Sequence, residues 1–194
     1  MSRPRCSRCL RPEGHCLCAL IPRLPSRTRV LILQHPSEAD HALNTARLAH
    51  LGLPNSQLAV TEQVAPALWE AYPGQACVLF PGEGSQLLPA GAEQPMQLIV
   101  LDGTWRKARK LLHLNPALAA LPRVSLAPVG PSRYRLRKAP GPDALSTVEA
   151  IVQALETLEP ESSYQELLKP FDALIDGQIA AMGEATYQRN HQGK

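Results

Sequence analysis

Four cysteines near the N-terminus are the residues best suited to bind a metal ion. They follow the pattern C-x2-C-x6-C-x-C, at Cys6, Cys9, Cys16 and Cys18. Thiolates at this spacing can complete a tetrahedral zinc site, and a segment with so few apolar residues needs such a cross-link to be ordered. Four thiolates leave no open coordination position, so the pattern predicts a structural zinc ion rather than a catalytic one. An iron–sulfur cluster and a redox role stay open as alternatives.

Asp102 is the carboxylate placed for acid–base chemistry. It follows the apolar run 98–101 and precedes Gly103-Thr104-Trp105. We therefore expect it at the carboxyl end of a buried strand, where open α/β sheets bind ligands. A carboxylate in this place can act as a general base, or it can cap the following helix, since Asp and Thr are both common N-caps. Spacing alone leaves both roles open.

Three further motifs combine a structural interpretation with a binding one. Ser146 and Glu149 fit the capping box S-x-x-E, a purely structural device at a helix start. His35 directly follows an expected strand, so it is either a pocket residue or part of a turn. The loop Phe80-Pro81-Gly82 contains a glycine that permits close backbone approach, but its pattern names no ligand.

These candidate residues must be positioned by strands and helices that alternate along the chain. Apolar runs predict strands over 30–33, 97–102 and 122–128, and within 76–84 a strand that runs into a Gly/Pro loop. An alternating pattern predicts another strand over 132–140. Helices are expected over 37–51, 62–72, 104–113, 145–158 and 164–182, the last with a break at Pro170. This alternation predicts an α/β fold around a largely parallel sheet with flanking helices.

Length and composition exclude several classes of protein. The chain has 194 residues, of which 44% are hydrophobic, enough for one folded domain with a real core. Its longest runs of Val, Leu and Ile are four residues, far below the roughly 20 apolar residues that span a bilayer, so we expect no membrane partner. The first residues contain arginines but no apolar stretch, so we also expect no secretory signal and a cytoplasmic location.

The formal charge of +3 conceals a strong segregation of charge. Residues 1–30 contain seven Arg against Glu13 alone, and residues 101–140 contain nine bases against Asp102 alone. The remaining chain carries fifteen acids and four bases. Such asymmetry favours a nucleic-acid partner over a merely uneven solvated surface.

In their order along the chain, these motifs resemble the DTW-domain family of tRNA-uridine aminocarboxypropyltransferases. The signature D-x-T-W stands at residues 102–105. The cysteine pairs followed by Ile21-Pro22, the element His35-Pro36-x-Glu38 and the Phe80-Pro81-Gly82 loop fit the family pattern. So does Tyr134-Arg135-Leu136-Arg137-Lys138, which leads into Leu145-Ser146-Thr147-Val148-Glu149-Ala150. The resemblance covers nearly the whole chain, up to about residue 183.

The resemblance implies an enzyme that transfers the 3-amino-3-carboxypropyl group of S-adenosylmethionine to N3 of a uridine in tRNA, releasing methylthioadenosine. It also implies a SPOUT-like α/β fold whose C-terminal part can form a knot. The expected divisions are a zinc-binding module at 1–22, the DTW domain at 23–183 and a tail at 184–194. tRNA is the expected partner, and no obligate protein partner is evident.

The resemblance also suggests roles for individual residues. Asp102 would remove the proton from uridine N3. The residues expected around S-adenosylmethionine are His35, Phe80, Pro81, Gly82, Thr104, Trp105, Ser146, Thr147 and Glu149. Those expected to contact tRNA are Arg106, Lys107, Arg109, Lys110, Arg133, Arg135 and Arg137. Arg133 or Arg135 can instead hold the carboxylate of the donor, and Trp105 is either a stacking or a core residue.

Two other functions stay open. The chain is alternatively a SPOUT-like RNA methyltransferase, because the same sulfonium can give up its methyl group. A non-catalytic, zinc-stapled RNA-binding module would also account for the cysteines and the segregated arginines.

Overall fold

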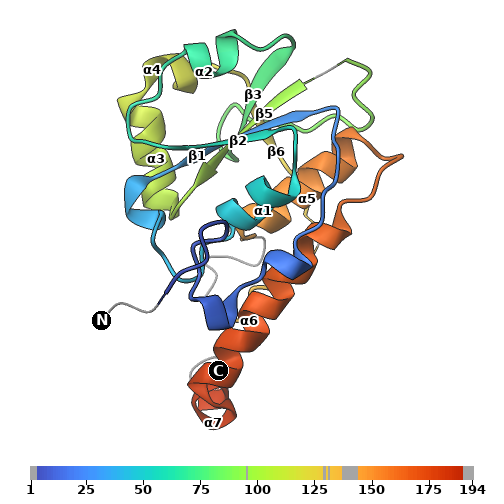
Figure 1. Ribbon diagram of the computed structural model, residues 1–194. Coiled ribbons are helices and arrows are strands. Elements are labelled where there is room, and N and C mark those ends of the chain that lie inside the picture. The colour runs from blue at the N-terminus through green and yellow to red at the C-terminus, as the bar shows by residue number, and fades with distance from the viewer. Residues whose placement is uncertain (1–3, 95, 129, 131, 137–143, 190–194) are drawn as a thin grey trace.

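The computed structural model describes residues 4–94, 96–128, 130, 132–136 and 144–189. A six-stranded sheet lies between two groups of helices (Figure 1). The strands are β1 (Arg29–Gln34), β2 (Ser56–Val60), β3 (Gln75–Leu79), β4 (Gln86–Leu87), β5 (Met96–Asp102) and β6 (Arg123–Ser125). They lie in the order β2-β1-β5-β3-β6-β4, and every neighbouring pair is parallel. The predicted α/β fold with a largely parallel sheet is confirmed.

Helices cover both faces of this sheet. They are α1 (Ala46–Gly52), α2 (Ala67–Glu70), α3 (Trp105–Leu114), α4 (Pro116–Ala119), α5 (Thr147–Leu158), α6 (Lys169–Met182) and α7 (Glu184–Tyr187). Residues of α1, α5 and α6 form one apolar core with the sheet, and residues of α2, α3 and α4 form the other. Central strands covered on both faces read as continuous apolar runs, which is why β1, β3 and β5 were predictable.

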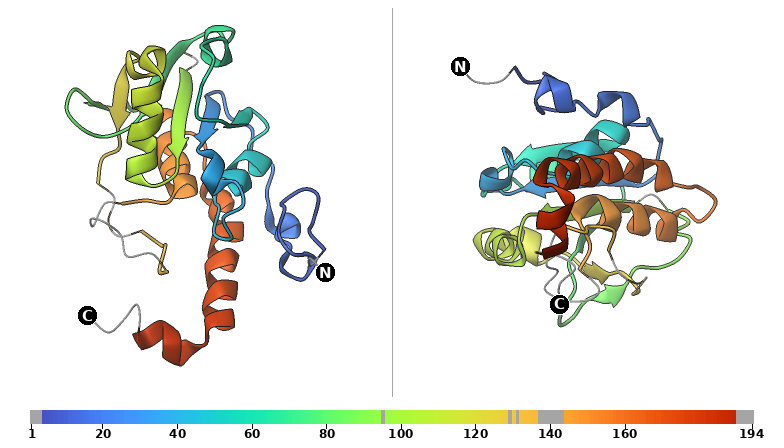
Figure 2. Two further views of the ribbon diagram at one scale, coloured as in Figure 1. Left: turned by 90° about the vertical axis from the view of Figure 1, so that its left-hand side faces the viewer. Right: turned by 90° about the horizontal axis from the view of Figure 1, so that it is seen from below.

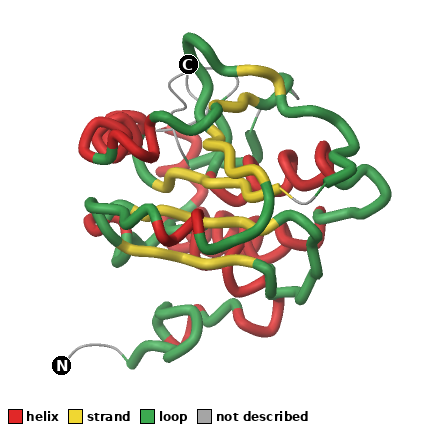
Figure 3. The backbone as a smooth tube through the Cα atoms, turned by 90° about the horizontal axis from the view of Figure 1, so that it is seen from above, coloured by secondary structure: helices red, strands yellow, loops and turns green. Residues whose placement is uncertain are grey.

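The order of the strands places an opening at the carboxyl ends of β1 and β5. The chain passes from β1 through α1 to β2 on one side, and then through α2 to β3 on the other side of β1. Right-handed crossovers in opposite directions put α1 and α2 on opposite faces of the sheet. Figure 3 shows the strands side by side, with the N-terminal segment outside the sheet. Open sheets bind ligands where the strand order changes direction in this way.

Two of the predicted helices are shorter than expected. Within 37–51, the segment before α1 contains a short 3-10 turn, Pro36–Glu38, followed by further turns. Its polar side chains bond to nearby backbone, Asn44 Nδ2 to the Glu38 carbonyl and His41 Nδ1 to the Leu43 N–H, and so compete with helical bonding. Within 62–72 only α2 forms, with Pro66 at its N-cap.

The strand expected over 132–140 is wrong for the residues that the structure describes. Ser132 to Leu136 form a bend and a turn, and residues 137–143 lie outside the described residues. The Ser132 hydroxyl and the Arg133 N–H both donate to the Glu149 carboxylate, so α5 rather than the sheet holds this segment. Arg137, which was expected to contact tRNA, therefore also lies outside the described residues.

The remaining predicted helices are confirmed as α3, α5 and α6. A 3-10 turn, Gln165–Leu168, precedes α6, and Pro170 lies in the first turn of that helix. Proline is well tolerated there because the first N–H groups of a helix have no partner within it. β2 and β4 were not predicted, since β2 is only partly buried and β4 has two residues, both exposed.

The two ends of the described chain lie outside the sheet. Short 3-10 turns at Glu13–His15 and Cys18–Leu20 order the N-terminal segment beside α6, and the C-terminal part of α6 extends beyond the sheet toward α7 (Figure 2). The knot stays a prediction, because residues 137–143 are not described. No described helix is long and apolar enough to cross a membrane.

Candidate active site and cysteine cluster

Asp102 lies where three elements meet. It ends β5, is 7% exposed, and is paired in register with Gln34 at the end of β1. Gln34 Nε2 donates to Oδ2 over 2.6 Å, and the hydroxyl of Thr147, the first residue of α5, donates to Oδ1 over 2.5 Å. The N-cap of α3 is Thr104, which accepts a hydrogen bond from the Lys107 N–H. Thr104, and not Asp102, is therefore the N-cap of α3.

Gly103 makes the turn between β5 and α3. Its φ is +147°, a value that side chains disfavour, and an added Cβ would lie 3.2 Å from Lys107 Cβ. The turn is therefore tight, and it leads directly from Asp102 to the N-cap of α3.

Two cavities meet beside this turn. The first, which we call the Asp102 cavity, has a volume of about 310 Å³ and is lined by Asp102, Thr104, Asn44 and Tyr134 among others. The second, which we call the large cavity, has about 650 Å³. Gly103, Ser146 and Thr147 line both, so the two cavities share a wall. Two molecules could therefore approach each other next to the Asp102 carboxylate.

The large cavity lies beyond the carboxyl ends of β3, β5 and β6. Its walls are mainly apolar, with Pro81, Trp105 and Leu126, and its polar groups include Ser125 and Gln153. Pockets of this size and composition bind small organic ligands. Trp105 is half-buried and packs edge-on against Phe80, with ring centroids 5.5 Å apart, so it serves both the core and the cavity wall.

The structure separates the residues expected around the donor into two groups. Pro81, Thr104, Trp105, Ser146 and Thr147 line one or both of these cavities. His35, Phe80, Gly82 and Glu149 line neither of them. For the second group a role in donor binding stays a prediction.

Two members of the second group have clear local partners. The His35 ring lies 2.6 Å from the Glu62 carboxylate through Nε2 and 2.9 Å from the Ser37 hydroxyl through Nδ1. Glu149 completes the predicted capping box with Ser146, which is confirmed. It is 7% exposed, and by also holding Ser132 and the Arg133 backbone it brings the following Tyr134 to the Asp102 cavity.

The bases expected to contact tRNA also fall into two groups. Lys107 pairs with Glu38, Lys110 with Glu62, Arg133 with Asp172 and Arg135 with Asp176. Arg106 and Arg109 are exposed on α3, and neither forms an ion pair within the described part of the chain. Arg109 lines the large cavity, whereas Arg133 and Arg135 line neither cavity. Arg109 is therefore better placed than either of them to meet a donor carboxylate.

The four N-terminal cysteines converge as a metal site requires. Their Sγ atoms all lie within 4.8 Å of one another, with Cys6 3.7 Å from Cys18 and Cys9 3.8 Å from Cys16. Zinc–sulfur bonds of about 2.3 Å in a tetrahedron place sulfur atoms about 3.8 Å apart. A disulfide needs about 2.05 Å, so the described cysteines are thiols.

The backbone favours an anionic sulfur at Cys6, whereas the thiol pKa values of Cys16 and Cys18 are raised above the ordinary value. Backbone N–H groups of Cys9 and Arg8 hydrogen-bond to Cys6 and lower the pKa of its thiol to about 6. The turn continues through Leu10, which has a φ of +59°, an uncommon value for a residue other than glycine. The segment is thus bent tightly around the sulfurs, and its donor set suits a thiolate-binding metal such as zinc.

Sequence reasoning missed Gln34 and Asn44 as parts of the site. Gln34 shares one signal with Asp102, since it is a polar residue at the end of an apolar strand. Its contact with Asp102 depends on β1 and β5 being neighbours, which the order of strands in the sequence does not give. Asn44 lies in the segment expected to be helical, where a cavity wall was not anticipated.

Comparisons with a family model and with curated proteins agree with each other. The DTW domain matches residues 3–179. "tRNA-uridine aminocarboxypropyltransferase 2" of Macaca fascicularis is 30% identical over 97% of this chain and 68% of its own length. The mouse protein of that name is 31% identical over 91% and 64%, and the Drosophila melanogaster one 31% over 91% and 76%. The chain thus spans about two thirds of the first two relatives. No solved structure matches the chain.

Proposed function

Because the chain belongs to the DTW-domain family, we propose that it transfers the 3-amino-3-carboxypropyl group of S-adenosylmethionine to N3 of a uridine in tRNA. Its relatives are named as tRNA-uridine aminocarboxypropyltransferases, and their similarity extends over most of the chain. The observation that carries the proposal is the Asp102 carboxylate, hydrogen-bonded on both oxygens beside the shared wall of two cavities. A two-substrate transfer needs this arrangement.

The Asp102 cavity suits the acceptor. Uridine N3 is a weakly nucleophilic imide nitrogen that carries a proton, so a base must remove this proton as the nitrogen attacks. Asp102 lines this cavity, and Thr104, Asn44 and Tyr134 supply polar groups that can orient a nucleobase. Because Gln34 and Thr147 fix the carboxylate, the base needs no rearrangement before proton transfer.

The large cavity suits the donor. Its apolar walls fit an adenine ring and a thioether, while Ser125, Gln153 and Arg109 provide polar contacts for the ribose and the amino-acid end. The sulfonium supplies a good leaving group when it is bound. N3 of the uridine forms a bond to the γ-carbon while the carbon–sulfur bond breaks, the bonding pair stays on sulfur as neutral methylthioadenosine, and the N3 proton passes to Asp102.

We further propose that the cysteine cluster holds a structural zinc ion. Four thiolates would fill all positions of a tetrahedral ion and leave none for a substrate. The ion would order a segment that has Cys9 as its single buried apolar residue within 4–18. Arg11 in this segment donates to the backbone carbonyls of Ala42 and Asn44, so an ordered cluster also supports the wall of the Asp102 cavity.

The test is a single-turnover assay with unmodified tRNA and S-adenosylmethionine. We expect the modified uridine by nucleoside mass spectrometry and methylthioadenosine in the supernatant. Replacing Asp102 with Asn should slow transfer about 10²- to 10⁴-fold, the usual contribution of a general base, and leave tRNA affinity unchanged. Label from the donor's methyl group entering RNA would identify a methyltransferase instead. Binding of tRNA with no modification under any condition would identify a non-catalytic RNA-binding module.

A further inference from the structure

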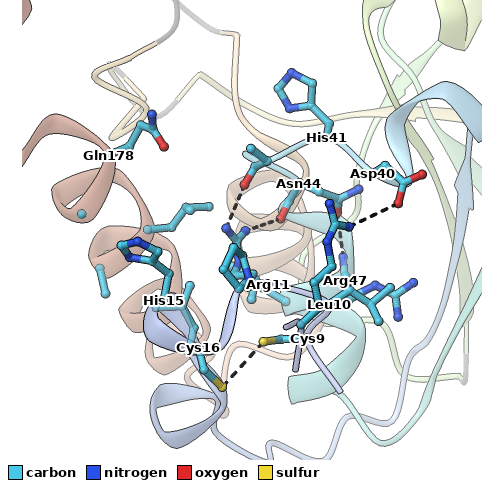
Figure 4. A pocket seen from close by; sticks show the side chains of 18 of the residues that line it. Cys9, Leu10, Arg11, His15, Cys16, Asp40, His41, Asn44, Arg47 and Gln178 are labelled. Carbon is cyan, nitrogen blue, oxygen red and sulfur yellow. Dashed lines mark hydrogen bonds and ion pairs between the residues drawn. The ribbon is translucent and has the colours of Figure 1, made fainter. Parts of the chain in front are cut away.

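A third cavity separates the cysteine segment from the body of the protein. It has a volume of about 440 Å³ and lies between residues 5–17, residues 39–48 and helix α6 (Figure 4). We call it the α6 cavity. Nothing in the proposed transfer uses it, because acceptor and donor occupy the other two cavities.

The cavity exists because one face of α6 has very small side chains. Ala173, Gly177 and Ala181 follow one another at intervals of four residues, so they share a face of the helix, and all three line the cavity. A Cβ added at Gly177 would meet no atom within 4 Å. Buried apolar residues such as Leu48 and Leu174 also line the cavity. His15 and Gln178 lie along one side (Figure 4).

The lining of the α6 cavity is basic. Arg5, Arg11 and Arg47 line it, against one carboxylate, Asp40, which lies 3.7 Å from Arg5. Arg11 is committed to the carbonyls of Ala42 and Asn44. The Arg47 guanidinium, in contrast, forms no hydrogen bond or ion pair with any described residue. A zinc ion bound by four thiolates would add a formal charge of −2 at one end, which the arginines of the same segment offset.

The α6 cavity adjoins the Asp102 cavity. His41 and Asn44 line both, so they stand at the junction between them. A chain that places one unit against Asp102 therefore has its next unit at the entrance to the α6 cavity. RNA has this form, with an anionic phosphate between successive bases.

We propose that the α6 cavity binds the nucleotide next to the target uridine, with Arg47 on its phosphate and His41 against its base. Single-stranded RNA is held in this way, by cations along the backbone and by flat side chains that stack on splayed bases. The inference rests on the proposed function, because it takes the uridine to occupy the Asp102 cavity. It gives the N-terminal segment a direct part in selecting substrate, in addition to its structural one.

The first test fills the cavity without disturbing the fold. Gly177→Glu adds bulk and negative charge where the structure has open space, and it also replaces a helix-weakening glycine within α6. We expect its melting temperature to equal or exceed that of the wild type, while its affinity for tRNA falls at least tenfold. Gly177→Ala is the matched control, since it strengthens the helix without filling the cavity, and it should bind tRNA normally. Normal tRNA binding by Gly177→Glu would overturn the proposal.

The second test removes the unpaired cation. Arg47→Ala should weaken binding to tRNA and lower the slope of log affinity against log salt concentration by about 1, as the loss of one phosphate contact does. Arg23→Ala removes an exposed arginine that lines none of the three cavities and should change neither quantity. An unchanged slope in Arg47→Ala would also overturn the proposal.

The anion bound in the α6 cavity could be an RNA phosphate or the carboxylate of the donor. Calorimetry of S-adenosylmethionine binding in the absence of tRNA distinguishes the two. We expect Arg47→Ala and Gly177→Glu to bind this donor as the wild type does. A loss of donor affinity would assign the α6 cavity to the donor carboxylate and end the RNA interpretation. These binding measurements need no turnover, so failure of the subsite and failure of the proposed transfer activity are distinguishable.

Discussion

Both oxygens of the Asp102 carboxylate accept hydrogen bonds, from donors that belong to different elements. Gln34 comes from the end of β1 and Thr147 from the start of α5. Gln34 is fully buried, and its Oε1 has no partner among the described residues. An amide kept in this position at some cost to stability is explained by its contact with Asp102. We infer that Gln34 is a positioning residue for the base.

Removing either donor should slow catalysis without weakening tRNA binding. Hydrogen bonds to charged groups contribute about 1.5–3 kcal/mol, so Gln34→Met and Thr147→Val should each lower kcat about 10- to 150-fold and leave KM for tRNA unchanged. Thr147→Ser keeps the hydroxyl and should retain most of the activity. Gln34→Met removes a buried oxygen that lacks a partner, so its thermal stability should be near that of the wild type. A higher KM at constant kcat would instead indicate a role in binding tRNA.

Individual residues of the candidate site were predictable only where one local pattern identifies them. Asp102 follows an apolar run and Ser146 begins a capping box, and both patterns are contained within a few residues. Gln34 was missed because its role depends on the pairing of β1 with β5. Arg133 and Arg135 face Asp172 and Asp176, acids about forty residues away that no short pattern connects to them.

At the scale of elements, the sequence predicted buried strands and long helices well and short exposed elements badly. β1, β3 and β5 each contain a continuous apolar run because helices cover both faces, so these runs suffice to predict the strands. β2 is partly exposed and mixes polar with apolar residues. The segment before α1 has the composition of a helix, but its Asn and His side chains bond to their own backbone. Tertiary context decides such segments.

Helix α3 should bind tRNA through the two arginines that lack ion-pair partners among the described residues. Reversing both, as Arg106→Glu with Arg109→Glu, should weaken tRNA binding and lower the slope of log affinity against log salt concentration by about 2. Arg23→Glu, at an exposed site away from the cavities, is the control for a general change of charge. If the salt slope of the double variant matches that of the wild type, α3 lies outside the interface.

The cysteine segment should depend on its metal, and the Asp102 cavity should depend on the segment. We expect about one zinc ion per chain by elemental analysis, and none in the double variant Cys9→Ser with Cys16→Ser. This variant should keep the circular dichroism of the α/β fold. Its melting temperature and its rate of transfer to tRNA should both fall, because Arg11 no longer holds residues 42–44 in place. Cys77→Ala removes a thiol from the core and should retain the metal. Full zinc content in the double variant would contradict the assignment.

Over the whole molecule, fewer bases are available to a partner than the count of charges by segment suggests. Among the described residues, six bases of the two basic segments form ion pairs with acids from elsewhere in the chain. Counting charges by segment therefore overstates the cationic surface available to a polyanion. The bases without such pairs include Arg47, Arg106 and Arg109, which lie near the cavities or on α3. The distribution of charge along the sequence predicted a polyanionic partner, and only the folded chain shows which described bases lack ion pairs.

The buried carboxylate of Glu159 connects the segment after α5 with the segment before β1. Glu159, which is 2% exposed and follows α5, accepts hydrogen bonds from the backbone N–H groups of Arg27 and Thr28 and from the Tyr164 hydroxyl. Burial alone would raise the pKa of Glu159. The hydrogen bonds from Thr28, Tyr164 and Arg27 outweigh burial and hold this pKa below its ordinary value of 4.5. The folded protein therefore favours the ionised form more than the unfolded chain does.

This difference predicts how stability depends on pH. The contribution of Glu159 should be fully present above pH 4.5, its ordinary pKa, and should be lost as the pH falls through its lower pKa in the folded protein. Glu159→Gln should lower the free energy of unfolding at pH 7 by about 1–3 kcal/mol, and by less in acid. Urea unfolding at pH 7, 5, 4 and 3 measures both. Glu161→Gln, which removes an exposed partner of Arg27, should cost less than about 1 kcal/mol throughout. The free energies of unfolding of wild type and Glu159→Gln converge in acid only if folding lowers the pKa of Glu159. A constant difference between these two free energies at all four pH values would therefore show that folding does not lower this pKa.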